Sequence, residues 1–193
     1  MRKIFLIQDF HEEFNVTKQV GVGSFARVYY AKRIETGEEY AVKAFSKKAI
    51  NAEVKGLEGL YNEVKIMKRL GESKYHMILY EIHETKHSVY MVIDYLPGGE
   101  LLKVISKKER IKEGSVKKIM KNFIKGLLEI HAKGVMHRDL KPENLMLKSR
   151  KRYEKVKIID FGLAAIIDQK EYLYKRCGTP GFVAPEIIKF GNE

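Results

Sequence analysis

The sequence predicts an α+β fold with two lobes, the first built mainly of strands and the second mainly of helices. Short runs rich in Val, Tyr and Phe, separated by turns, indicate the first lobe between residues 14 and 96. A long apolar stripe at helical spacing after residue 115 indicates the second. With 193 residues, 45% of them hydrophobic, the chain can form one sizeable core or two small lobes that share a cleft.

The first lobe is predicted to contain five strands and one inserted helix. The strands cover residues 16–22, 27–33, 39–45, 77–83 and 88–95. A glycine-rich turn over residues 21–26 separates the first two strands, and Pro97-Gly98-Gly99 ends the lobe near Leu96. The helix covers residues 59–70, because Leu60, Val64 and Met67 recur at i, i+4 and i+7.

The second lobe begins with a long predicted helix. Its stripe of apolar side chains is formed by Val116, Ile119, Met120, Phe123, Ile124, Leu127, Leu128 and His131. Ser115 is placed to cap the start of this helix, and Gly134 is placed to end it. Short strands are then predicted over residues 145–147 and 156–159, joined by a basic turn.

Composition excludes several classes of protein. The formal net charge is +12, but the lysines are scattered and no zinc-ligand or aromatic RNA-binding motif accompanies them, so we expect no nucleic-acid partner. The single cysteine, Cys177, excludes an internal disulfide and fits a reducing compartment. No apolar run is long enough to cross a bilayer, and the stretch over residues 4–7 is too short for an export signal. We therefore expect an intracellular, cytoplasmic protein without a transmembrane segment.

The glycine-rich segment over residues 21–28 is compatible with three structures. Gly21-Val22-Gly23-Ser24-Phe25-Ala26 could be a plain hairpin turn, a dinucleotide-binding turn or a loop that folds over the phosphates of ATP. A dinucleotide-binding turn leads into a helix, whose N-terminus holds the phosphates. Here Val28 and the residues after it are predicted to form a strand, which argues against that alternative.

A charged residue follows on the third strand, at Lys43. A compact ammonium group supplies the fixed positive charge that a neighbouring phosphate requires. Such a group needs an anionic partner, and Glu63 lies on the helix face that also carries Met67, so it can point toward the strands. A glutamate on a helix is more often simply solvated. An ion pair between Lys43 and Glu63 is therefore supported only by the glycine-rich segment and the strand lysine that precede Glu63 in the sequence.

The most specific segment is His137-Arg138-Asp139-Leu140-Lys141-Pro142-Glu143-Asn144. Phosphoryl transfer needs a carboxylate that orients the attacking hydroxyl and accepts its proton, and Asp139 can do both. Lys141 can neutralise charge on the transferred group. Asn144 offers an amide oxygen, a ligand that Mg²⁺ accepts.

Together with Asp160-Phe161-Gly162 and Ala184-Pro185-Glu186, this segment resembles the catalytic domain of eukaryotic-type Ser/Thr protein kinases, over residues 14–186. The resemblance implies a bilobal kinase-like fold with a five-stranded antiparallel N-lobe and one helix (14–96), part of a helical C-lobe (97–193), and an N-terminal extension (1–13). It implies ATP and Mg²⁺ as cofactors and proteins with Ser or Thr acceptors as substrates.

The resemblance also implies a role for each residue of the site. Asp139, Lys141, Lys43 and Glu63 would be catalytic, the last two as an ion pair, and Asn144 and Asp160 would bind the metal. The nucleotide would contact Gly21, Val22, Gly23, Ser24, Phe25, Val28, Ala41, Met146, and the hinge from Asp94 to Leu96, with Ile93 as gatekeeper. Met67, Leu79, His137 and Phe161 would stack as one apolar column, and Thr179 would bond near Asp139 and Lys141.

Substrate choice and regulation are implied by a few further positions. Glu100 and Glu143 match acidic positions that receive an arginine of the substrate in related kinases, although both could instead be solvated acids. The segment over residues 177–186 is typical of calmodulin-dependent-type kinases, so calmodulin or a regulatory tail outside this chain is a possible partner. Residues 163–176 contain no Ser or Thr, so we expect no activating Ser/Thr phosphosite there.

Two functions of different class remain open at this point. One is an ATP-dependent Ser/Thr protein kinase that prefers basic substrates. The other is an ATP-binding but catalytically impaired fragment or regulatory module, because the kinase family continues with further C-lobe helices beyond Ala-Pro-Glu. Apolar surface left on the long helix and the catalytic loop would then be exposed or covered by a partner.

Overall fold

The computed structural model describes residues 10–23, 26–107, 111–149 and 152–189. The chain forms two compact units. The first unit contains Met1–Leu57 and Ile78–Tyr95, and the second contains Glu58–Met77 and Leu96–Glu193. The predicted inserted helix over residues 59–70, which we expected to belong with the strands, is therefore grouped entirely with the second unit.

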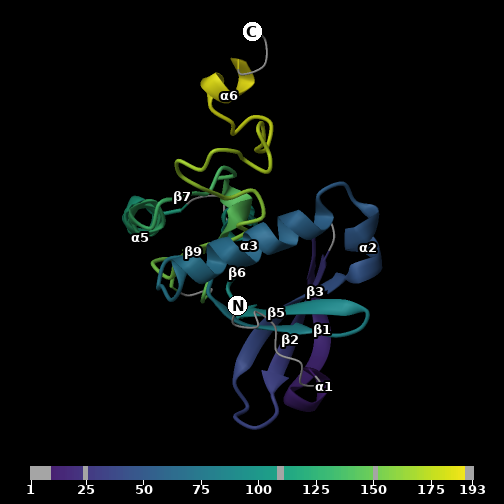
Figure 1. Cartoon of the computed structure of the whole chain (residues 1–193). Helices are drawn as coiled ribbons and strands as arrows, with labels where there is room; N and C mark the ends of the chain where they lie inside the picture. The colour runs from purple at the N-terminus through teal and green to yellow at the C-terminus, as the bar shows by residue number, and fades with distance from the viewer. Residues whose placement is uncertain (1–9, 24–25, 108–110, 150–151, 190–193) are drawn as a thin grey trace. The chain divides into compact units, whose positions relative to one another are not determined.

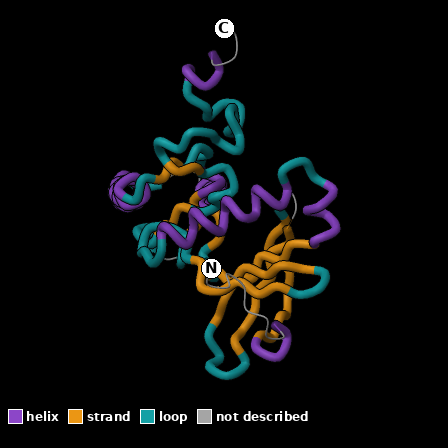
Figure 2. The backbone as a smooth tube through the Cα atoms, viewed as in Figure 1, coloured by secondary structure: helices purple, strands orange, loops and turns teal. Residues whose placement is uncertain are grey.

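The first unit is built on a five-stranded antiparallel sheet (Figure 2), as predicted. Its strands follow the order β1-β2-β3-β5-β4. Their bounds are β1 Phe14–Val22, β2 Ala26–Arg33, β3 Glu39–Ser46, β4 Leu79–Glu84 and β5 Ser88–Asp94. Each lies within two residues of the predicted range, because alternating apolar runs and turn residues mark strand ends clearly.

Cross-strand register separates the residues of this sheet into two faces. Lys43 lies opposite Val28 on one side and Met91 on the other, so these three side chains share a face. Ala41 and Ile93, two residues further along their strands, lie on that same face. The opposite face, called the outer face below, carries the residues that alternate with these.

The outer face is covered at one end by a short helix that the sequence analysis did not predict. Helix α1 (Phe10–Glu13) lies next to β1 (Figure 1), and its Phe10 packs with Phe14, Ala31, Val42 and Val92. Phe10, in the stretch 1–13 that we expected to be an extension before the domain, therefore packs in the core of the first unit. A second unpredicted helix, α2 (Lys47–Ala52), begins at Ser46, whose hydroxyl accepts a hydrogen bond from the Ala49 N–H.

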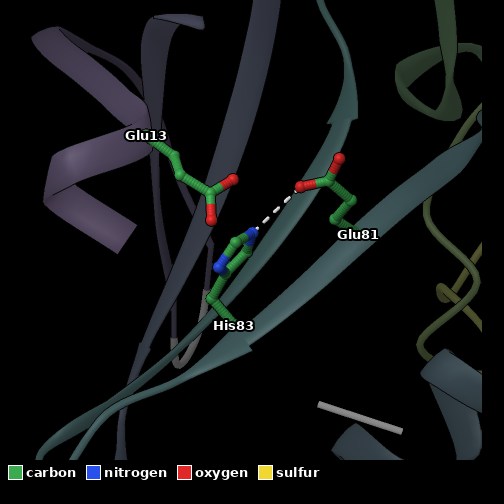
Figure 3. A group of neighbouring side chains, drawn as sticks. All are labelled: Glu13, Glu81 and His83. Atoms are coloured by element: carbon green, nitrogen blue, oxygen red, sulfur yellow. Dashed lines mark hydrogen bonds and ion pairs between the residues drawn. The ribbon is translucent and has the colours of Figure 1, made fainter. Parts of the chain in front are cut away.

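A charged group fastens α1 to the sheet. Glu13, Glu81 and His83 converge on the outer face (Figure 3), and His83 Nε2 lies 3.0 Å from a Glu81 oxygen. Arg33 pairs with both carboxylates, through Nη1 to Glu13 at 3.2 Å and through Nη2 to Glu81, and its guanidinium stacks over Phe14. Two of these three ligand-type side chains, Glu13 and Glu81, thus already hold a cation, the guanidinium.

Removing this guanidinium should destabilise the first unit. Arg33→Met keeps most of the aliphatic stem but leaves two partly buried carboxylates without their partner. We expect the free energy of unfolding, measured in urea, to fall by about 1–3 kcal/mol. Arg152→Met is the matched control, because the Arg152–Glu154 pair is 61% and 41% exposed and should contribute almost nothing. Equal losses in the two variants would contradict this view of Arg33.

The second unit consists of helices and two small sheets. One sheet has the order β6-β8-β9 and the other pairs β10 with β7. The helices are α3 Gly56–Leu70, α4 Leu101–Ser106, α5 Glu113–Ala132, the 3₁₀ turn η1 Pro142–Asn144, and α6 Pro185–Lys189. The strands are β6 Gly99–Glu100, β7 Val135–Met136, β8 Leu145–Leu147, β9 Val156–Ile158 and β10 Ala165–Ile166.

The long helix α5 packs closely against β9. A Cβ on its Gly126 would lie 2.9 Å from Ile158 Cδ1 and 3.1 Å from Tyr75 Cβ, so a larger residue there would require these neighbours to shift. Gly134, with φ +65°, follows the helix C-terminus as predicted. The predicted cap is wrong, because the helix begins earlier, at Glu113, and Ser115 lies inside its first turn.

One side of α5 is exposed. Its Val116, Met120, Ile124 and Leu128, spaced four residues apart, are all between 42% and 64% accessible. This matches the expectation that the long helix would present apolar surface. None of the described helices is both long and apolar enough to span a bilayer.

Candidate active site

The strands β7, β8 and β9 hold the segment from His137 to Asn144 in the second unit. The segment leaves β7 at Met136 and enters β8 through the 3₁₀ turn η1, where β8 pairs with β9. Just beyond β9, the Ile159 N–H donates to the Asn144 carbonyl at 2.9 Å. This hydrogen bond fixes Asp160, the next residue, beside the end of the segment.

His137 anchors this segment from inside the unit. Its side chain is buried, with Nε2 2.9 Å from the Ile159 carbonyl and its ring 5.1 Å from the Phe161 ring. Burial lowers the pKa of His137, and the carbonyl of Ile159 only partly opposes this, so the ring is neutral near pH 7. Met67 is also buried in this unit, but Leu79 belongs to the first unit, so the predicted four-residue column stays a prediction.

The carboxylate of Asp139 is the centre of a hydrogen-bond network. The side-chain amide of Asn144 donates to Oδ2 at 2.9 Å, and Lys141 Nζ lies 3.0 Å from the same oxygen. Thr179 donates to Oδ1 twice, from its backbone N–H at 3.0 Å and from its hydroxyl at 2.6 Å. Lys141 also donates to the Thr179 hydroxyl at 2.5 Å. The predicted bonding of Thr179 with Asp139 and Lys141 is confirmed.

These bonds keep Asp139 ionised although it is only 9% exposed. Burial alone would raise the pKa of Asp139, because it removes water from the charged form. Hydrogen bonds from Thr179, Lys141 and Asn144, together with the charge of Lys141, outweigh burial and bring the pKa below its ordinary value. The result is a carboxylate that is charged and fixed in direction at neutral pH.

The two predicted metal ligands, Asn144 and Asp160, lie near each other, because the Ile159 N–H bonds to the Asn144 carbonyl. The Asn144 side chain uses its nitrogen to donate to Asp139, which directs its amide oxygen elsewhere. Asp160 is exposed, has φ +63°, and accepts one hydrogen bond from the Gly162 N–H at 3.2 Å. One amide oxygen and one carboxylate at neighbouring positions fit a hard cation such as Mg²⁺.

Arg138, next to the central aspartate, is held by the segment that follows Asp160. Its Nε donates to the Leu163 carbonyl at 2.8 Å and its Nη1 to the Tyr174 carbonyl at 2.7 Å. The guanidinium also lies over the Tyr172 ring, 5.3 Å from its centre. Two backbone carbonyls and a ring therefore hold this arginine, while its Nη2 is buried without a hydrogen-bond partner among the described residues. The absence of an activating Ser/Thr phosphosite in residues 163–176 stays a prediction.

The glycine-rich segment lies in the first unit, between β1 and β2. The Gly23 N–H donates to the Ala26 carbonyl at 2.8 Å, and Gly21 lies opposite Val28. Because Ala26 begins a strand, the dinucleotide-binding alternative is wrong. The predicted nucleotide contacts of Ser24 and Phe25 lie outside the described residues.

Other predicted site residues are divided between the two units. Lys43 lies on β3 in the first unit with its amine 5.2 Å from the centre of the Phe45 ring, whereas Glu63 is buried on α3 in the second. Their ion pair stays a prediction. The nucleotide contacts also stay predictions, with Val28, Ala41 and Asp94 in the first unit and Leu96 and Met146 in the second.

Asp94 has a structural use of its own. Its carboxylate accepts hydrogen bonds from the Ile78 N–H at 2.9 Å and from the Tyr80 hydroxyl at 3.1 Å. Both donors lie at the start of β4, so the side chain ties the two strands β4 and β5 together. Only its backbone was predicted to contact the nucleotide.

The two acidic residues proposed to receive substrate differ in their surroundings. Glu100 pairs with Lys103 at 2.6 Å on the surface. Glu143 has a buried oxygen, Oε2, with no hydrogen-bond partner among the described residues. A buried carboxylate oxygen without a donor favours a cation, so Glu143 has the stronger claim to a substrate arginine.

Sequence reasoning missed the residues that tie α3 to the segment after Asp160. The Asn62 side chain donates to the Ala164 carbonyl at 2.8 Å, and Gly59 approaches the Tyr174 hydroxyl so closely that a Cβ would lie 2.9 Å away. The partners of Asn62 and Gly59 are more than 100 residues away along the chain. No local pattern marks such pairs.

Comparison with known proteins agrees with this geometry. The sequence profile of the family described as "Protein kinase domain" matches residues 14–193. The chain is 38% identical over 178 residues to CBL-interacting protein kinase 11 of Oryza sativa subsp. japonica, covering 91% of this chain and 34% of that protein. It is 37% identical over 179 residues to CBL-interacting serine/threonine-protein kinase 20 of Arabidopsis thaliana, covering 91% and 39%.

A third relative comes from a distant organism. The chain is 36% identical over 183 residues to a probable serine/threonine-protein kinase 2 of Plasmodium falciparum (isolate K1 / Thailand), covering 95% of this chain and 34% of the relative. The chain therefore spans between a third and two fifths of the length of these relatives. It belongs to the protein kinase domain family.

The expectation of a calmodulin-dependent type is not supported. The expectation rested on ten residues, 177–186. The matches over 178 and 179 residues are to CBL-interacting kinases. A motif of ten residues within one loop reflects the chemistry of that loop, and it is too short to distinguish one group of the family from another.

The Asp139 network makes a prediction about pH. Thr179→Val removes a hydroxyl that donates to Asp139, so the free energy of unfolding at pH 7 should fall by about 1–2 kcal/mol. The lowered pKa of Asp139 contributes stability above the unfolded value near pH 4, and this contribution is lost as the pH falls through the folded pKa. The difference between wild type and variant should therefore shrink at about pH 3.

Urea unfolding at several pH values measures this difference. Thr179→Ser keeps the hydroxyl and is the matched control, with stability close to wild type at every pH. A difference between Thr179→Val and wild type that stays the same from pH 7 to about pH 3 would mean that Asp139 is not the group affected.

Proposed function

We propose that this chain carries the catalytic segment of an ATP-dependent Ser/Thr protein kinase. The observation that supports this most strongly is the buried carboxylate of Asp139 with Lys141, Asn144 and Thr179 bonded around it. A carboxylate fixed in this way is suited to orient a hydroxyl and take its proton. The relatives named serine/threonine-protein kinases support the same class of acceptor.

The proposed reaction transfers the γ-phosphoryl group of ATP. The acceptor hydroxyl oxygen bonds to the γ-phosphorus, and the bond from that phosphorus to the bridging oxygen of ADP breaks. The bridging oxygen leaves with the electron pair, and the hydroxyl proton passes to Asp139. Lys141, which contacts both Asp139 and Thr179, supplies positive charge beside the transferred group.

We propose ATP and Mg²⁺ as the cofactors. Asn144 and Asp160 would hold the cation, which supplies charge neutralisation at the phosphates when bound. Lys43, paired with Glu63, would hold the phosphates from the first unit, below the glycine-rich segment. Val28, Ala41, Met146 and the backbone from Asp94 to Leu96 would enclose the adenine.

We also propose that the protein substrates carry basic residues before the acceptor. The buried oxygen of Glu143 supports this, because an arginine guanidinium would give it the donor that no described residue provides. Glu100 is a weaker candidate, since Lys103 already neutralises it.

A second candidate function is an ATP-binding module with little or no catalysis. Among the described residues, α5 presents an exposed apolar stripe, and a surface of this kind is suited to a partner or regulatory role. An intact Asp139 network favours the first function. The two candidates differ in turnover and agree in nucleotide binding.

A phosphorylation assay with Mg-ATP and an arginine-containing peptide separates the two candidates. Wild type should transfer phosphate, and Asp139→Asn should lower kcat by about 10²–10⁴-fold, because asparagine cannot accept the proton. Asp168→Asn is the matched control, since Asp168 is exposed and, at φ +62°, tolerates asparagine equally well. Replacing the peptide's arginine by alanine should raise KM.

The outcomes differ for the two candidates. Equal transfer by wild type and Asp139→Asn would contradict the catalytic role. No transfer by wild type, together with a thermal shift on addition of Mg-ATP, would instead establish the ATP-binding module. No transfer and no thermal shift would contradict both.

A further inference from the structure

A groove on the outer face of the five-stranded sheet has no part in the proposed reaction. Its volume is about 610 Å³, within the range of sites that bind small ligands. The described residues that line it all belong to the first unit. The groove lies on the face opposite Lys43, because its floor includes Val42 and Ala44, which alternate with Lys43 along β3.

The pairing of three strands explains why the sheet is hollowed at Ala44. Arg27 on β2, Ala44 on β3 and Tyr90 on β5 lie opposite one another across the sheet. A methyl group between two long side chains leaves a depression at the centre of this set. Two residues further along β3, Ser46 lies opposite Ser88, so small side chains continue the depression toward helix α2.

Aromatic side chains form the two walls of the groove. On one side Phe10 is fully buried and its ring is stacked 4.3 Å from the Tyr90 ring, so this wall is held in place. On the other side Tyr29 lines the groove from β2. Because only β3 separates β2 from β5, the backbones of the two walls are about 10 Å apart. A planar ring that lies on Ala44 can therefore contact both tyrosines.

The charge of the groove is positive. Among the described residues that line it, Arg27 is the one arginine, lysine, aspartate or glutamate. Arg27 is exposed, and no other described residue forms an ion pair or a side-chain hydrogen bond with it. A single guanidinium matches the two oxygens of one carboxylate through two parallel hydrogen bonds. A ligand with one negative charge therefore complements this groove.

We propose that the groove binds a small aromatic carboxylate. The ring would lie over Ala44, between Tyr29 and Tyr90, and the carboxylate would accept hydrogen bonds from Arg27. A saturated ring of the same size would gain less, because aromatic pairs are stabilised beyond the area that they bury. This binding does not depend on the proposed kinase reaction, since Lys43 lies on the other face of the sheet.

Titration with 2-naphthoate, followed by calorimetry, tests the proposed ligand class. We expect saturable binding with a Kd near or below about 1 mM, which is the affinity of a ligand of this size at an ordinary free energy per atom. The uncharged 2-naphthamide has nearly the same shape and should bind about tenfold more weakly, because it cannot form the charged hydrogen bonds to Arg27. The saturated decahydro-2-naphthoate should also bind more weakly.

Two variants test the position of the ligand. Ala44→Leu fills the depression and should abolish binding of 2-naphthoate, whereas Ala52→Leu is the matched control, because Ala52 is exposed on α2 and does not line the groove. Arg27→Gln should bind 2-naphthoate and 2-naphthamide equally weakly. Arg152→Gln, at an exposed arginine of the second unit, should keep the tenfold preference for the carboxylate.

Arg27→Gln also guards against misfolding of Ala44→Leu, because it changes only an exposed side chain. A preference for 2-naphthoate that persists in Arg27→Gln would overturn the proposal, as would unchanged binding in Ala44→Leu. So would equal affinity for the saturated acid. Lack of saturation up to about 10 mM would also overturn it, whether the groove is too shallow or is covered by a second copy.

Mg-ATP separates this site from the proposed nucleotide site. Saturating Mg-ATP should leave 2-naphthoate bound, because the two ligands would occupy opposite faces of the sheet. Displacement by Mg-ATP would place 2-naphthoate in the nucleotide site and overturn the proposal. Failure of the wild type to bind Mg-ATP would contradict the proposed function alone and would leave the binding of 2-naphthoate unchanged.

Discussion

In the second unit, one buried carboxylate, that of Asp139, needs hydrogen bonds from the protein in place of water, and these bonds connect distant segments. A carboxylate that is 9% exposed must obtain from the protein the hydrogen bonds that water would otherwise provide. Asn144 and Lys141 supply them from the same segment, and Thr179 supplies two more from 40 residues further along the chain. These bonds fix Thr179 beside the segment that carries Asp139, although the two residues are 40 positions apart. Positive φ values at Arg138 and Asp160, uncommon for residues with side chains, lie on either side of the carboxylate.

In the first unit the poorly solvated charge is a cation, the guanidinium of Arg33, and its partners are carboxylates. Arg33, 18% exposed, obtains its partners from α1 and β4, which are 20 and 48 residues away in the chain. In both units a poorly solvated charge therefore joins segments that are distant in sequence. Such pairs select one arrangement of the chain, since a partner lost on one side leaves a buried charge without compensation on the other.

Much of the fold could be predicted because its signals are local. Strand ranges follow from alternating apolar residues and turns, and the segment from His137 to Asn144 carries its chemistry in eight adjacent residues. The short helices α1 and α2 were missed because four and six residues hold too few turns for a periodic pattern. Ser115 was wrongly taken as a cap, since a capping residue and a first-turn serine look alike in sequence. The bonds of Asn62 and Arg33 could not be predicted, because each joins residues that only the folded chain brings together.

The proposed proton transfer requires that the folded chain hold Asp139 ionised. Titration of the Asp139 side-chain carboxyl by carbon-13 NMR, with Asp139→Asn to assign its signal, tests that claim most directly. We expect a pKa for Asp139 below its ordinary value, because bonds from Thr179, Lys141 and Asn144 outweigh burial. In Thr179→Val the pKa of Asp139 should rise toward or above that value. A pKa in wild type at or above the ordinary value would contradict the account, since burial would then dominate and the network would not hold the charge.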